Sequence, residues 1–230
     1  MRIFGLRPLL LFLSGFSAIA SADIIRLDST PGLNTSAGVT TVAIMPDPAW
    51  EPNHPVNPGD SADTSAVWVS YENTGYGGSQ FQPTEGTTPV VTVIDTFDSG
   101  AGTLFLNVWA DDTAAVILDG QFLSYPVFTQ SICSGQPIGC RPQDDGVFDV
   151  PIAAGEHELD FVLYQVGTGT NTFTNPFGLI FTGTAPADPP PASVPEPKAW
   201  LLLGSLLLVI AASRFVRWKR AGVSAENRSA

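Results

Sequence analysis

Apolar and polar residues alternate with a period of two in short segments spread over residues 39–182. Every second residue is apolar from Leu104 to Ala110, and again from Leu159 to Leu163. Because side chains of a β-strand point alternately to its two faces, this pattern predicts half-buried strands. The segments predicted as strands are Val39–Ile44, Ala66–Tyr71, Pro89–Thr96, Thr103–Ala110, Ala114–Leu118, Gln121–Tyr125, Val147–Ile152, Glu158–Tyr164 and Phe177–Thr182.

Turn residues separate these segments, and no stretch between Asp23 and Gly183 has the period of an α-helix. Asp119 and Gly120 lie between two predicted strands, and both residue types adopt the positive φ that a two-residue hairpin turn needs. Many short strands joined by such turns are typical of an all-β protein, here an antiparallel, jelly-roll-like β-sandwich. A chain of 230 residues with 22 glycines and 20 prolines fits one such domain with extensions.

An apolar run at the start of the chain predicts a secretory signal peptide over residues 1–22. Arg2 and Arg7 precede a run of 11 residues from Leu9 to Ile19, which is too short to span a bilayer. The small residues Ala20–Ala22 predict cleavage by signal peptidase before Asp23. An uncleaved membrane anchor is the alternative.

A second apolar run predicts one transmembrane helix over about residues 199–216. Eighteen helical residues span about 27 Å at 1.5 Å per residue, close to the hydrocarbon thickness of a bilayer. A basic cluster follows, and such clusters stay on the cytoplasmic side. Its members are Arg214, Arg217, Lys219 and Arg220. We therefore expect the domain outside the inner membrane and residues 221–230 as a cytoplasmic tail.

Charge divides along the same boundary. Residues 23–194 contain 20 acidic and two basic residues, a net charge of −18, whereas residues 195–230 carry +4. A body this acidic excludes a nucleic-acid binder, because such proteins neutralise phosphates with Lys and Arg. It suits a divalent cation or a neutral glycan as a partner.

A proline-rich segment, residues 184–193, separates the predicted domain (23–183) from the span and is expected to be an extended linker. The next four residues are Val194, Pro195, Glu196 and Pro197. Together with the apolar run and the basic cluster, they make residues 194–220 resemble the PEP-CTERM sorting signal of bacterial surface proteins.

This resemblance implies that the chain is a substrate of exosortase, with the Val194–Pro197 segment as the recognition motif. It also implies release from the inner membrane to the cell surface or to an exopolysaccharide matrix. A plain membrane anchor on a proline-rich stalk is the alternative.

The two cysteines, Cys133 and Cys140, are predicted to form a disulfide that closes a short loop. An exported protein folds in an oxidising compartment, which favours this bond. Two thiols without a nearby histidine make a poor zinc site.

The densest acidic feature is the pair Asp111–Asp112, which follows a predicted strand. Adjacent carboxylates repel each other unless a cation lies between them, and calcium takes six to eight oxygen ligands. The block Trp109–Gly120 resembles the Asp-Asp…Asp-Gly signature of the lectin-like domain in anthrax protective antigen and yeast adhesins, and Ala154–Gln165 resembles its closing strands. The resemblance implies a calcium site at the pair, with Asp119 as a further candidate ligand. The alternative is that these aspartates only cap turns.

Enzyme motifs are absent from the sequence: there are two histidines, His54 and His157, and no nucleophile elbow, phosphate loop or His-Glu-x-x-His. We therefore expect a non-catalytic module that binds exopolysaccharide, with calcium as the candidate cofactor. One alternative is a purely structural matrix protein with no discrete ligand. A secreted two-carboxylate glycan hydrolase is the other.

Overall fold

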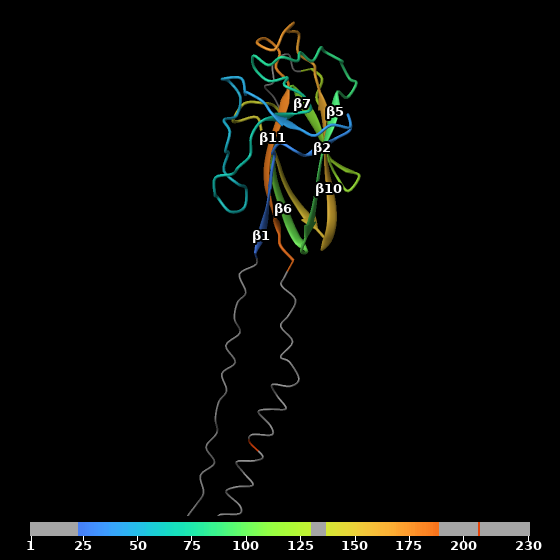
Figure 1. The fold of residues 1–230 in the computed structure, drawn as a ribbon. Helices are drawn as coiled ribbons and strands as arrows, with labels where there is room; N and C mark the ends of the chain where they lie inside the picture. Colours follow the sequence, from blue (N-terminus) through green and yellow to red (C-terminus); the bar gives the residue numbers. More distant parts are fainter. Residues whose placement is uncertain (1–22, 130–136, 189–206, 208–230) are drawn as a thin grey trace, which may run out of the picture. The chain divides into compact units, whose positions relative to one another are not determined.

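The computed structural model describes residues 23–129, 137–188 and 207, and its first two ranges contain strands and turns but no helix. The strands form two antiparallel sheets (Figure 1), as the alternation predicts. Among the described residues, no helix is long and apolar enough to cross a membrane. The predicted signal peptide, the Val194–Pro197 motif and the basic cluster lie outside the described residues, as does the predicted span apart from Leu207.

One sheet has the strand order β3-β4-β11-β6-β9, with β1 also paired to β11. Its strands are β1 (Ile24–Asp28), β3 (Val42–Ala43), β4 (Val69–Ser70), β6 (Gly102–Asp111), β9 (Gly146–Ile152) and β11 (Gly178–Pro186). The other sheet has the order β2-β5-β10-β7-β8. Its strands are β2 (Asn34–Thr35), β5 (Val91–Ser99), β7 (Thr113–Leu118), β8 (Gln121–Ser124) and β10 (Gly155–Tyr164).

The main core lies between the two sheets and is built from the predicted apolar faces. Leu104, Leu106 and Val108 of β6 are fully buried in it. Phe161 of β10 stacks on Phe181 of β11 with ring centroids 4.3 Å apart, so this pair joins the two sheets.

A second apolar cluster contains Trp109 of β6 and Ile180 of β11, which alternate with the residues of the main core. Trp50 and Trp68, whose ring centroids lie 4.1 Å apart, also belong to it. The segment between β3 and β4 therefore covers the outer surface of this sheet, which explains why β11 is buried along nearly its whole length.

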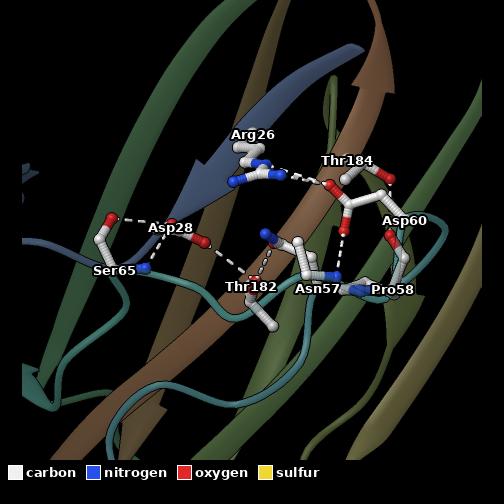
Figure 2. A network of polar contacts seen from close by, with 9 residues as sticks. Arg26, Asp28, Asn57, Pro58, Asp60, Ser65, Thr182 and Thr184 are labelled. Carbon is white, nitrogen blue, oxygen red and sulfur yellow. Dashed lines mark hydrogen bonds and ion pairs between the residues drawn. The ribbon is translucent and has the colours of Figure 1, made fainter.

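Polar side chains tie the loop of residues 57–65 to the edge of the same sheet (Figure 2). Asp28 of β1 accepts hydrogen bonds from N and Oγ of Ser65, at 3.0 and 2.9 Å. Its other carboxylate oxygen accepts a bond from Oγ1 of Thr182 in β11, at 2.9 Å. One carboxylate thus fastens the loop to two strands.

The paired strands β1 and β11 define the two ends of the domain. Ile24 pairs with Pro186, so the chain enters and leaves the sandwich at one end. Asp111 pairs with Gly178, at the opposite end of β11.

Because β11 continues to Pro186, the expected linker boundary at residue 184 is wrong: the strand contains the first three residues assigned to the linker.

Candidate functional site

The pair Asp111–Asp112 lies where the chain crosses from one sheet to the other. Strand β6 ends at Asp111 and β7 begins at Thr113, so Asp112 is the single residue between them. The peptide bond within the pair is cis. Both aspartates are buried, with exposed fractions of 5% and 2%.

Asp112 is held by the loop that follows β10. Its Oδ2 accepts hydrogen bonds from the backbone N–H groups of Val166 and Gly167, at 2.8 and 2.5 Å. This is the amide capping that the sequence offered as the alternative to a metal site.

Asp111 has a different environment. Burial raises the pKa of this carboxyl well above its usual range, and the charge of Asp112 and a side-chain hydrogen bond with Asp112 raise it further. A side-chain hydrogen bond from Trp50 acts in the opposite direction. Two carboxyl groups in such contact must share a proton or a cation, because two bare negative charges repel strongly at this distance.

Asn175 brings a third oxygen donor to the pair. It is 5% exposed, and its Nδ2 has no hydrogen-bond partner. A Cβ placed on Gly167 would meet both Oδ1 of Asn175 and Oδ2 of Asp112. The missing side chain at Gly167 is therefore what lets the amide oxygen and the carboxylate approach each other.

These residues line an open pocket of about 210 Å³. Polar groups dominate its lining, and its positive charge comes from Arg141, one of the two basic residues in residues 23–194. Phe173 contributes an exposed ring. The full lining is Asp47, Ala49, Trp50, Asp111, Asp112, Arg141, Thr168, Gly169, Phe173, Thr174, Asn175 and Pro176.

The donor set suits a hard cation. Asp111 and Asp112 supply carboxylate oxygens, Asn175 supplies an amide oxygen, and calcium prefers oxygens of these kinds. No group of three or more His, Cys, Asp or Glu side chains that would hold a metal occurs in the described residues. A calcium ion here would therefore complete its shell with Asn175, backbone carbonyls and water.

Asp119 does not belong to this site. It lies at the other end of β7, about 20 Å away at roughly 3.3 Å per residue, so it cannot share a cation with Asp111 and Asp112. It occupies the predicted hairpin turn, with φ of 50° at Asp119 and 76° at Gly120. Its Oδ1 accepts a hydrogen bond from the backbone N–H of Glu158 at 2.9 Å.

The other oxygen of Asp119 pairs with His157. Nδ1 of His157 lies 2.7 Å from Oδ2 of Asp119, and Nε2 lies 3.1 Å from the carbonyl oxygen of Ala153. Both ring nitrogens face acceptors, which favours the doubly protonated ring. Burial alone would lower the pKa of His157, but the hydrogen bonds to Asp119 and Ala153 and the nearby charges raise it overall.

The remaining sequence-based site predictions are tested only in part by the described residues. Cys140 is disulfide-bonded, and Cys133 lies outside the described residues. A further acidic pair, Asp144–Asp145, lies outside the pocket lining and provides a control for the Asp111–Asp112 pair.

The residues of this pocket that the sequence did not single out include Asp47, Arg141, Phe173 and Asn175. They come from three loops, and nothing in their spacing shows that the loops meet. The only local signal was the glycine-, threonine- and asparagine-rich stretch at residues 167–175, which is typical of a tight loop.

No protein-family model and no curated protein sequence matches the chain significantly. Among the solved structures with some similarity is a β-(1,4)-mannanase of Podospora anserina, which combines a family 26 glycoside hydrolase with a family 35 carbohydrate-binding module. The two chains are 11% identical with a TM-score of 0.35, and the match covers 74% of this chain and 29% of the mannanase. A family 35 carbohydrate-binding module from Clostridium thermocellum has 8% identity and TM-score 0.31, covering 69% and 100%. The family 35 carbohydrate-binding module of Abf62 from Cellvibrio japonicus is 10% identical with a TM-score of 0.30, and the match covers 72% of this chain and 99% of that module. Likeness this low does not decide a ligand.

Proposed function

We propose that residues 23–188 form a non-catalytic, calcium-dependent carbohydrate-binding module of an exported surface or matrix protein. The observation that carries the proposal is the contact between the buried Asp111 and Asp112 carboxyl groups at the edge of an open pocket. A divalent cation relieves the repulsion within such a pair.

The residues beside the pair support a carbohydrate as the ligand. Calcium in a pocket open to solvent keeps coordination positions that sugar hydroxyls are able to fill. Thr168 and Thr174 on the rim offer further hydrogen-bonding groups, and Phe173 adds an apolar ring. The pocket thus combines a cation site with the mixed polar and apolar lining that a sugar needs.

Export and sorting belong to the same proposal. Support comes from the signal-like residues 1–22, the acidic domain and the Val194–Pro197 motif before an apolar run. Changing Pro195, Glu196 and Pro197 to Ala should leave the protein in the membrane with its C-terminal segment attached. An unchanged location and an unchanged C-terminal peptide map would contradict sorting.

The binding proposal is tested by retention of the purified chain on immobilised galactomannan, dextran and alginate, with 2 mM calcium or with EDTA. We expect calcium-dependent retention on at least one polysaccharide, and its loss in Asp111→Asn. Asp145→Asn is the matched control, because the acidic pair Asp144–Asp145 lies outside the pocket lining. This variant should bind like wild type.

Two outcomes would contradict the proposal. No retention in either buffer would favour the purely structural protein. Release of reducing sugar from any of the three polysaccharides, lost in a carboxylate variant, would favour the hydrolase.

A further inference from the structure

Phe173 is the exposed ring of the pocket that contains Asp111 and Asp112. Its exposed fraction is 62%, whereas Trp50, the other aromatic residue of the lining, is 4% exposed. A single exposed phenylalanine is common on protein surfaces and has no meaning by itself. What distinguishes Phe173 is how firmly its ring and its backbone are held.

The ring rests on a neighbouring loop. Tyr76 meets it edge to face, with ring centroids 5.2 Å apart and an interplanar angle of 87°. Gly77 lies against it in the left-handed region, at φ of 70°, and a Cβ there would come within 3.1 Å of Cε1 of Phe173. The absence of a side chain at Gly77 therefore lets the Phe173 ring pack against the backbone there.

The backbone of the loop is fixed as well. The N–H of Phe173 donates to Oδ1 of Asn171 at 2.9 Å, and Oγ1 of Thr172 donates to the carbonyl oxygen of Gly78 at 2.9 Å. Two residues later the loop supplies Asn175 to the acidic pair. The ring and the oxygen donor thus belong to one hydrogen-bonded segment, and little conformational freedom remains to be lost when a ligand binds.

We infer that Phe173 is the stacking platform of this site and takes the C–H face of a pyranose ring whose hydroxyl groups reach toward Asp111 and Asp112. This inference rests on the proposed function. It follows from the chemistry of a sugar, which presents hydroxyl groups at its edge and C–H groups on its faces. The pocket offers oxygen donors for a cation beside one exposed, preorganised ring.

The test compares Phe173→Ala, Phe173→Trp and Phe122→Ala in the full chain. Phe122 is also exposed, at 49%, but lies on β8 outside the pocket lining, so it is the matched control. We expect Phe173→Ala to weaken calcium-dependent retention on the polysaccharide by at least tenfold, and Phe173→Trp to retain binding. The stabilisation that calcium gives in thermal unfolding should stay at the wild-type value in all three variants.

Retention of Phe173→Ala equal to wild type would overturn the inference while leaving the proposed function intact. Loss of the calcium-dependent stabilisation in Phe173→Ala would also overturn it, since the ring would then support the cation site rather than the sugar. If wild type itself shows no calcium-dependent retention, both proposals fail.

Discussion

At the scale of single residues, the charge around Asp111 and Asp112 decides what the pocket attracts. Arg141 lines the same pocket as these carboxylates, and its guanidinium makes no ion pair with any described residue. Its positive charge opposes the entry of a cation. The other basic residue of the domain, Arg26, forms an ion pair with Asp60 at 2.9 Å (Figure 2).

Replacing Arg141 by Gln should therefore strengthen calcium binding, on the order of threefold, as expected for removing one charge near the pocket. Arg26→Gln changes the net charge equally and is the control. Calcium titrations of both variants by calorimetry decide the point. Equal calcium affinities in Arg141→Gln and Arg26→Gln would contradict a specific effect of Arg141 on the pocket.

At the scale of elements, the loop of residues 57–65 depends on Asp28. Asp28→Ala removes three hydrogen bonds to a carboxylate and should lower the free energy of unfolding by about 2 kcal/mol. Asp149→Ala, on the exposed face of β9, should change it by less than about 0.5 kcal/mol. Urea unfolding measures both, and equal losses would contradict a specific role for Asp28.

The sequence predicts nine of the eleven described strands and misses β1 and β2. The alternation in β6 and β10 marks strands that pack on the core, and each predicted strand overlaps an observed one. Strand β2 has only two residues, too few for any period. Strand β1 was missed because it lies at the edge of the sheet and Leu27 is its one buried residue.

The candidate site was predictable only as far as it is local. Asp111 and Asp112 are adjacent, so their shared position at the end of a strand follows from the pattern. Asp119 was grouped with them through the resemblance to the Asp-Asp…Asp-Gly signature, but β7 separates the two positions by its full length. Asn175 joins the pair only because the loop after β10 returns to the end of β6, which no sequence period records.

At the scale of the whole molecule, protonation should stabilise the calcium-free protein. Burial raises the pKa of Asp95 to about 6 and raises that of Asp111 well above its usual range. The pKa of His157 is also raised. Stability from such groups is fully present below the unfolded pKa and is lost as pH rises through the folded pKa.

The midpoint of thermal unfolding in EDTA should therefore be higher at pH 5 than at pH 8. Asp95 contributes as pH falls from about 6 toward 4, and His157 contributes below about 6.5 and loses its effect above. Burial alone would raise the pKa of Asp119, but hydrogen bonds from Glu158 and His157 lower it overall. The stability that Asp119 contributes is therefore lost only as pH falls below its usual pKa. A midpoint that falls at pH 5 would contradict this assignment.

The whole molecule also presents its site away from the end at which the chain enters and leaves. The Asp111 end of β6 and the Pro186 end of β11 lie at opposite ends of the sandwich.

The measurement that tests the central claim most directly is thermal unfolding of the purified chain at pH 7.5 with calcium and with EDTA. A ligand that binds only the folded state at a hundred times its dissociation constant stabilises it by about 2.7 kcal/mol. We predict a rise of this order for wild type and Asp145→Asn, and none for Asp111→Asn or Asp112→Asn. An unchanged midpoint in wild type, or the same rise in all four proteins, would contradict a calcium site at Asp111 and Asp112.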